Sequence, residues 1–219
     1  ALRRHGRVSN TTKVNAPKAS KSINVRFPPP PPCGETVIVA ESLCKGYAGV
    51  DVFEDIGFDL GRGERLLVLG LNGAGKTSLL RILAEETEAD LGRFEFGYRV
   101  QAGYYAQEHD NLRVHEDLLT NLRDSVPAGV EMTDTHLRGL LGMFGLSGDK
   151  VFQESGTLSG GEKTKLALAM LMTGRNSLLL LDEPTNNLDP PSREAVARAL
   201  IDWPGAIIGV PPSTPNTPT

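Results

Sequence analysis

The residues from Gly70 to Thr77 have the types and spacing of a loop that binds phosphate. The pattern is G-x-x-x-x-G-K-[ST], and it lies between a strand-like run and a helical stretch that begins near residue 76. Glycines let consecutive backbone N–H groups converge on phosphate oxygens, and the positive end of the following helix favours the same anion. We therefore expect a nucleotide to contact Gly70, Leu71, Asn72, Gly73, Ala74, Gly75, Lys76, Thr77 and Ser78.

Two pairs of side chains carry chemistry suited to a nucleotide and its metal ion. In the loop, Lys76 is placed to reach the β- and γ-phosphates, and the Thr77 hydroxyl is placed to bind Mg²⁺. Further along, the apolar run at residues 178–181 ends in Asp182 and Glu183. Such a run predicts a strand covered on both faces, whose carboxyl end opens at the ligand-binding edge of the sheet. We expect Asp182 to hold Mg²⁺ and Glu183 to orient or deprotonate an attacking water.

A third motif, LSGGE at residues 158–162, predicts the start of a helix, because Ser159 and Glu162 have the spacing of a capping box. Together with the phosphate loop upstream and the two carboxylates downstream, it resembles the signature of ATP-binding cassette (ABC) ATPases. The resemblance covers residues 36–210. In that family two cassettes pack head to tail, so it implies a second ABC cassette as partner. The γ-phosphate bound by that second cassette would contact Ser159, Gly160 and Gly161.

The same resemblance assigns roles to further positions. Gln107 lies where the family has its Q-loop glutamine, which senses the γ-phosphate and joins the metal shell. Tyr47, ahead of the second predicted strand, fits the aromatic residue that stacks on adenine; a core position for this ring is the alternative. Residues 187–189 resemble the D-loop. The implied ligands are ATP and Mg²⁺, and the implied reaction is ATP hydrolysis, with catalytic roles for Glu183, Lys76 and Gln107.

The residues that flank the motifs resemble the ABC-F class, which comprises proteins with two tandem cassettes that act on translation. They are the KTK sequence at 163–165 and the TNN sequence at 185–187. The proline-rich leader at residues 27–34 resembles the segment before the second cassette of actinobacterial members. The resemblance therefore implies a C-terminal ABC-F cassette, with the ribosome and its RNA as partners. The alternative is the nucleotide-binding subunit of a transporter, to which a transporter membrane subunit would attach near Gln107.

After the last predicted strand the sequence departs from the family pattern. ABC cassettes continue into a switch whose histidine contacts the γ-phosphate, whereas residues 211–219 read PPSTPNTPT. We therefore expect a truncation before the switch histidine and a disordered or aberrant tail at residues 211–219. A hydrolysis-impaired nucleotide-binding fragment is the third functional alternative.

Strands that alternate with helices must position these motifs, and this alternation indicates an α/β fold with parallel pairing. The resemblance specifies a P-loop fold of ABC type, with a mainly parallel core sheet, an antiparallel β subdomain and a small helical subdomain. The predicted strands span residues 36–40, 50–60, 65–70, 99–105, 178–181 and 206–210, and the predicted helices span 76–86, 114–125, 133–144, a segment from 159, and 192–203.

Charge divides the chain into a basic leader and an acidic body. Residues 1–34 contain seven Lys and Arg and no Asp or Glu, whereas the rest contains 16 basic and 27 acidic residues. With few apolar side chains to offset ordering entropy, residues 1–35 are predicted to be a disordered, proline-rich linker. Residues 36–210 are predicted to form the ATP-binding domain, with the helical subdomain at about residues 108–157.

Cysteine content and hydropathy exclude two classes of protein. With only Cys33 and Cys44, a disulfide-stapled secreted scaffold is not expected, and a reducing compartment fits. No apolar run approaches the roughly 18 residues that span a bilayer, and the N-terminal residues lack the apolar core of a secretory signal. We expect a cytoplasmic protein with no transmembrane segment.

Overall fold

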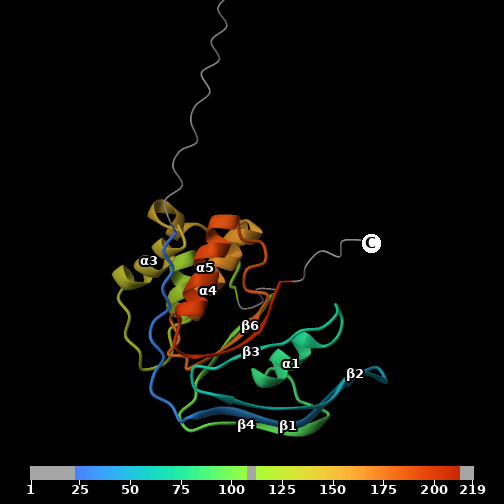
Figure 1. Cartoon of the computed structure of the whole chain (residues 1–219). Helices are drawn as coiled ribbons and strands as arrows, with labels where there is room; N and C mark the ends of the chain where they lie inside the picture. Colours follow the sequence, from blue (N-terminus) through green and yellow to red (C-terminus); the bar gives the residue numbers. More distant parts are fainter. Residues whose placement is uncertain (1–22, 108–111, 213–219) are drawn as a thin grey trace, which may run out of the picture.

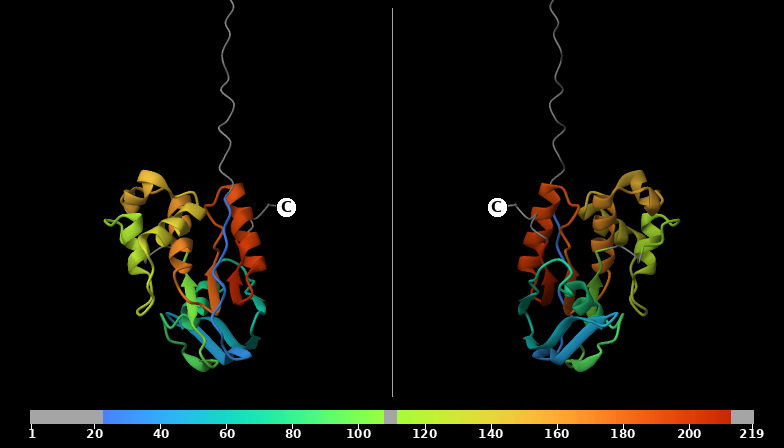
Figure 2. Two further views of the ribbon diagram at one scale, coloured as in Figure 1. Left: turned by 90° about the vertical axis from the view of Figure 1, so that its left-hand side faces the viewer. Right: turned by 90° about the vertical axis from the view of Figure 1, so that its right-hand side faces the viewer.

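The computed structural model describes residues 23–107 and 112–212 (Figure 1). An antiparallel sheet lies at one end, a parallel sheet lies beside it, and a group of helices flanks the parallel sheet (Figures 1 and 2). The predicted α/β class, with its parallel core, antiparallel part and helical part, is confirmed. The predictions for residues 1–22 and 213–219 concern positions outside the described ranges.

The antiparallel sheet has the strand order β2-β1-β4. Its strands are β1 (Thr36–Tyr47), β2 (Val50–Gly61) and β4 (Leu91–Phe96). A two-residue turn joins β1 to β2, with φ of 51° at Ala48 and 80° at Gly49. Positive φ at both central residues matches the twist of the flanking strands. The sequence prediction ended β1 at residue 40 and missed β4. The end of β1 at Tyr47 depends on hairpin pairing with β2, and β4 exists through pairing with β1 across some fifty residues.

The parallel sheet has the strand order β3-β7-β6-β5, and every neighbouring pair is parallel. The strands are β3 (Arg65–Leu67), β5 (Ala102–Tyr105), β6 (Leu178–Asp182) and β7 (Ala206–Val210). Because β7 lies between β3 and β6, the segments that follow β3 and β6 meet across the end of β7. All four strands therefore deliver their carboxyl ends to one edge, where ligands bind in open α/β sheets.

Both faces of this sheet are covered, as the unbroken apolar run in β6 predicts. Leu178 and Leu180 pack into a cluster with α1 (Lys76–Leu83) and the antiparallel sheet. Leu179 and Leu181 pack on the opposite face, in a cluster that includes α4 (Gly160–Leu171) and α5 (Pro190–Asp202). The alternation of side chains along one strand thus joins two separate hydrophobic cores.

The helical part consists of α2 (Leu118–Asp124), α3 (Asp134–Met143) and two 3-10 turns, η1 (Gly148–Phe152) and η2 (Ser155–Thr157). Side chains of Asp117 and Thr133 cap α2 and α3. α1 ends three residues before the predicted end, because Glu85 adopts a left-handed φ of 60° and Glu86 N donates to Arg81 O. No helix within the described ranges is long and apolar enough to cross a membrane.

Residues 23–35 pack against the domain, and we call this segment the strap. Val25 and Phe27 are each 7% exposed and belong to the same cluster as α4 and α5. Trp203 Nε1 donates to Pro28 O at 2.8 Å, and the views in Figures 1 and 2 agree that the strap runs alongside α5. The prediction of disorder is therefore wrong for this part of the leader, because Val25 and Phe27 are buried in a cluster with distant helices, which local composition does not reveal.

Candidate functional site

The phosphate loop connects β3 to α1. Ala74 N donates to Leu71 O at 3.1 Å, so the middle of the loop is a tight turn. Gly73 and Gly75 have φ of 84° and 79°, a region that favours glycine. A Cβ on Gly75 would lie 2.3 Å from Cγ1 of Val52 on β2. The antiparallel sheet therefore approaches the loop closely enough that only glycine fits at residue 75.

The Lys76 side chain folds back over this loop. Its Nζ donates to the carbonyl oxygens of Gly70 at 3.0 Å and Leu71 at 2.9 Å. The ammonium is thereby held at the N-terminal end of α1, whose backbone dipole also favours an anion. The predicted loop residues and Lys76 therefore lie together at the N-terminal end of α1.

Thr77 and Asp182 meet at the carboxyl edge of the parallel sheet. Thr77 Oγ1 donates to Asp182 Oδ2 at 2.7 Å. Asp182, the last residue of β6, is only 1% exposed. Burial raises the pKa of its carboxyl, an effect that the Thr77 hydrogen bond opposes and the neighbouring charge of Glu183 reinforces. The predicted pair of metal ligands is therefore brought together.

Glu183 is turned into the site by the backbone that follows β6. It has a left-handed φ of 50°, its N–H donates to Val210 O at 3.1 Å, and its carbonyl accepts from Asn186 N at 3.0 Å. Pro184 occupies the second position of the resulting turn, which its fixed φ favours. Asn186 Nδ2 also donates to Glu183 Oε2, so the turn orients the carboxylate that it presents.

Gln107 and Tyr47 approach the same edge from other elements. Gln107 follows β5, and its Nε2 donates to Glu183 Oε2 at 3.4 Å. Tyr47 ends β1, and its hydroxyl donates to Ser78 Oγ on α1 at 3.3 Å. Because Tyr47 is 50% exposed, the alternative of a core position for this ring is wrong.

These residues surround one cleft of about 580 Å³. Sequence reasoning missed two residues that line it, Val52 and Asn186. The TNN sequence contained a signal for Asn186, since a polar residue two positions after Pro184 can close a turn. Val52 is an ordinary strand residue, and only the fold shows its position. The predicted residues that line the cleft are Tyr47, Asn72, Gly73, Gly75, Lys76, Thr77, Ser78, Gln107, Asp182 and Glu183.

Comparison with known proteins agrees with this geometry. The profile of the family described as "ABC transporter" matches residues 53–186, which include the phosphate loop, the LSGGE segment and the two carboxylates. This chain belongs to the ABC family of ATP-binding domains. That match begins inside β2 and ends just after Glu183, so it covers most of the cassette that the structure describes.

Curated relatives are longer than this cassette. The probable ATP-binding protein YheS of Haemophilus influenzae is 39% identical over 84% of this chain, which corresponds to 29% of that protein. A probable ATP-binding cassette sub-family F member 3 homolog of Encephalitozoon cuniculi is 36% identical over 89% of this chain and 34% of that protein. The cassette thus spans about a third or less of these relatives, and their names are consistent with the ABC-F class.

A solved structure supports the fold. The dimeric ATP-binding cassette MJ0796, in a post-hydrolysis state bound to ADP and Pi, superposes with a TM-score of 0.71. The match covers 80% of this chain and 88% of that chain, at 18% identity. At this level of identity the similarity concerns the arrangement of helices and strands.

The signature segment of the cassette lies outside the cleft. Ser159 caps α4 through the expected capping box, in which its side chain and backbone N–H both contact Glu162. A Cβ on Gly161 would lie 2.5 Å from Asn187 O, so the start of α4 packs closely against the segment after β6. None of Ser159, Gly160 and Gly161 lines the cleft that contains Lys76 and Glu183.

The residues of the cleft fit Mg²⁺. Thr77 and Asp182 supply hard oxygen donors, which suit this ion. Across the described parts of the chain, no group of three or more His, Cys, Asp and Glu could hold a metal ion by itself. Mg²⁺ usually has only one or two protein ligands, with water and substrate phosphates completing the shell, so a small donor set beside a phosphate loop is what this ion requires.

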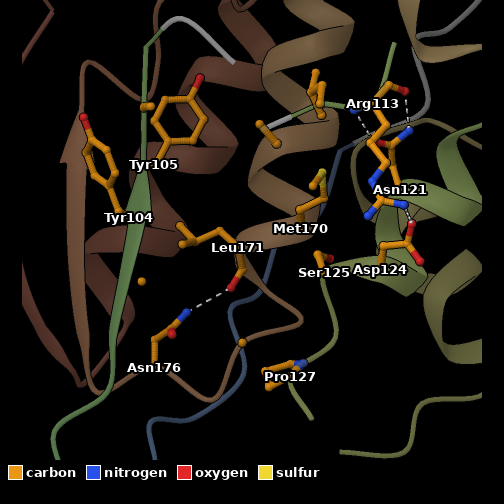
Figure 3. A pocket seen from close by; sticks show the side chains of 15 residues that line it. Tyr104, Tyr105, Arg113, Asn121, Asp124, Ser125, Pro127, Met170, Leu171 and Asn176 are labelled. Atoms are coloured by element: carbon orange, nitrogen blue, oxygen red, sulfur yellow. Dashed lines mark hydrogen bonds and ion pairs between the residues drawn. The ribbon is translucent and has the colours of Figure 1, made fainter. Parts of the chain in front are cut away.

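A separate groove lies between β5, α4 and the helical part. Figure 3 shows Tyr105 on one side and Arg113 and Asn121 on the other, with Met170 between them. The polar residues on that side bind one another: Arg113 N donates to Asn121 Oδ1, and the Arg113 side chain forms an ion pair with Asp124. The groove is lined by Ala106, the residue before Gln107, and so borders the cleft.

Proposed function

We propose that this cassette binds ATP with Mg²⁺ and hydrolyses it together with a second cassette. The observation that carries the proposal is the 2.7 Å contact between Thr77 Oγ1 and Asp182 Oδ2 beside the phosphate loop. In this proposal the loop N–H groups and Lys76 bind the phosphates, and Thr77 and Asp182 hold the metal ion, with Gln107 as a further ligand. Mg²⁺, when bound, would neutralise charge that develops on the phosphates.

Glu183 is proposed to orient or deprotonate the attacking water. The amide of Asn186 supports this role, because it holds Glu183 Oε2 in position within the cleft. Gln107 donates to the same oxygen and is proposed to sense the γ-phosphate. Ser159, Gly160 and Gly161 are proposed to contact a γ-phosphate bound by the second cassette. Ser159 and Gly160 are exposed at the N-terminal end of α4, which favours an anion, and none of the three lines the cleft of its own cassette.

Substitution of Lys76 and Glu183 tests this function. We expect Lys76→Ala to abolish ATP binding measured by calorimetry in the presence of Mg²⁺, and Lys163→Ala on α4 to leave it unchanged. Glu183→Gln is expected to retain ATP binding and to lower hydrolysis by about 100-fold or more. Glu131→Gln is the control, because Glu131 is exposed and does not line the cleft. Equal turnover in Glu183→Gln and Glu131→Gln would contradict the assignment of Glu183.

We further propose that the cassette is the C-terminal one of a cytoplasmic ABC-F protein that acts on the ribosome. The support is the likeness to relatives named as F-family members and the strap, whose packing suits a linker entering the cassette from a preceding domain. Co-sedimentation with ribosomes in the presence of a non-hydrolysable ATP analogue tests it. Ribosome binding that depends on the analogue is expected, and association with membranes alone would contradict it.

The second candidate is the nucleotide-binding subunit of a membrane transporter. The groove beside Ala106 favours it, because a segment of a transporter membrane subunit seated there would lie next to Gln107 (Figure 3). Met170→Arg would obstruct this groove without touching the cleft. Under the transporter candidate the variant loses its association with membranes, whereas under the ribosomal one it still co-sediments with ribosomes.

A further inference from the structure

The ammonium group of Lys45 lies beside the Tyr47 ring and also donates hydrogen bonds. Its Nζ donates to Asp90 Oδ1 at 2.8 Å and to Glu88 O at 2.9 Å, and it lies 5.4 Å from the centroid of the Tyr47 ring. The Lys45 side chain is only 12% exposed. A cation within about 6 Å of a tyrosine ring is attracted by the ring's electrons. Lys45 therefore contacts both the ring and the segment that leads into β4.

Asp90 holds the backbone on either side of this lysine. Its Oδ2 accepts from Gly46 N at 2.7 Å, and its own N–H donates to Cys44 O at 2.9 Å. The hydrogen bond with Asp90 raises the pKa of Lys45, and the same bond lowers the pKa of Asp90. Both groups are charged at neutral pH. The Asp90 carboxylate thus binds Lys45 and Gly46, the two residues before Tyr47, and the Asp90 backbone binds Cys44.

Three constraints meet at Tyr47. Lys45 and Asp90 fix the strand that carries it, the two-residue turn at Ala48 and Gly49 follows it directly, and its hydroxyl donates to Ser78 on α1. The ring is nevertheless half exposed and lines the cleft. An exposed aromatic face that is held in one orientation loses little conformational entropy when a planar group stacks on it.

We propose that Lys45 and Asp90 are positioning residues that hold the Tyr47 ring ready for the base of the bound nucleotide. This inference rests on the proposed ATP-binding function. Neither residue lines the cleft or touches a phosphate position, so both act through Tyr47. The opposing view is that the pair only links β1 to the start of β4. Loss of the pair would then weaken the fold and lower the affinities for the base and the phosphates of a nucleotide equally.

Two ligands separate these views. ATP has a base and a triphosphate, whereas inorganic tripolyphosphate has no base, and calorimetry with Mg²⁺ measures the affinity of the chain for each. For Lys45→Met we expect ATP affinity to fall about 2- to 10-fold, the range for a side chain that must be ordered on binding. Tripolyphosphate affinity is expected to stay unchanged. Asp90→Asn should behave in the same way.

The matched control is Arg93→Ala. Arg93 also joins β4 to β1 through an ion pair, with Glu41 at 2.9 Å, but does not contact Tyr47. This variant should leave both affinities unchanged. Tyr47→Ala should lower ATP affinity alone, and addition of Lys45→Met to it should cause no further loss, because the two act through one ring.

The outcomes separate failure of the positioning role from failure of the proposed ATP-binding function. An ATP affinity in Lys45→Met equal to that of Arg93→Ala, equal losses for both ligands, or a further loss in the double variant would each overturn the positioning role. Failure of the unsubstituted chain to bind either ligand, or an unchanged ATP affinity in Lys76→Ala, would instead overturn the proposed function.

Discussion

The Thr77 hydroxyl donates to the Asp182 carboxylate at 2.7 Å, across a sequence separation of 105 residues. Thr77 lies in the first turn of α1 and Asp182 ends β6, and β7 lies between β3 and β6, the strands that lead to them. Parallel pairing places both at the same edge of the sheet. The contact brings together two oxygen donors that neither motif supplies alone.

Substitution of Asp182 should remove the metal dependence of nucleotide binding. We expect Mg²⁺ to raise the ATP affinity of the unsubstituted chain, and Asp182→Asn to reduce this gain by about tenfold or more, because an amide is a weaker ligand for a hard cation. Calorimetry with Mg²⁺ and with a chelator measures it. Asp202→Asn, an exposed position on α5, is the control, and an intact gain in Asp182→Asn would refute the assignment.

Two glycines of the phosphate loop should differ in their tolerance of a methyl group. Both have positive φ, but a Cβ on Gly75 would collide with Val52, whereas a Cβ on Gly73 would meet nothing within 4 Å. Gly73→Ala is expected to lower the free energy of unfolding by about 1 kcal/mol, from backbone strain alone. Gly75→Ala should cost about 2 kcal/mol more, because packing must also shift. Urea unfolding compares them, and equal losses would show that the loop moves freely away from β2.

The ion pair between Lys165 and Asp189 should make stability depend on acid pH. The Lys165 hydrogen bond and then that of Ser192 lower the pKa of Asp189 to about 2. A carboxyl with a lowered folded-state pKa stabilises the fold above its ordinary pKa of about 4, and this contribution is lost as pH falls towards 2. Lys165→Met should therefore cost about 1 kcal/mol at pH 7, since the pair is partly exposed, and progressively less as pH falls below about 4.

Urea unfolding between pH 7 and pH 3 tests this prediction. The comparison is Arg198→Met, which breaks the ion pair with Glu194 on the outer surface of α5 and should cost less than about 0.5 kcal/mol. A difference between Lys165→Met and the unsubstituted chain that stays constant over this pH range would show that packing, and not charge, accounts for the loss.

The strap should contribute to the stability of the cassette, and the fluorescence of Trp203 should show whether the strap is in place. Phe27 is buried in the same cluster as Trp203, the only tryptophan of the chain. Phe27→Ala is expected to lower the free energy of unfolding by about 3 kcal/mol. It should also shift the emission of Trp203 to longer wavelength, because water reaches the indole. Phe152→Ala, at a side chain that is 57% exposed, should do neither. Unshifted emission in Phe27→Ala would show that the strap does not shield Trp203.

Much of the site could be predicted because its motifs are contiguous. The phosphate loop works through successive backbone N–H groups, and the capping box at Ser159 works within four residues, so both can be read from spacing. β6 could be predicted because burial on both faces requires an unbroken apolar run. The existence of β4 could not be predicted, since it depends on pairing with β1 across some fifty residues. The end of β1 at Tyr47 was missed as well, because it depends on the register of its pairing with β2.

The sequence by itself determined which groups are proposed to do chemistry in this protein: a phosphate loop with its lysine, a hydroxyl and two carboxylates. Only the tertiary structure decided how they are arranged and supported. Asn186 holds Glu183, Val52 limits Gly75, Asp90 and Lys45 orient Tyr47, and the strap covers Trp203. The physical reason is range: local backbone geometry follows from neighbouring residues, whereas these contacts exist only after separate elements have packed together.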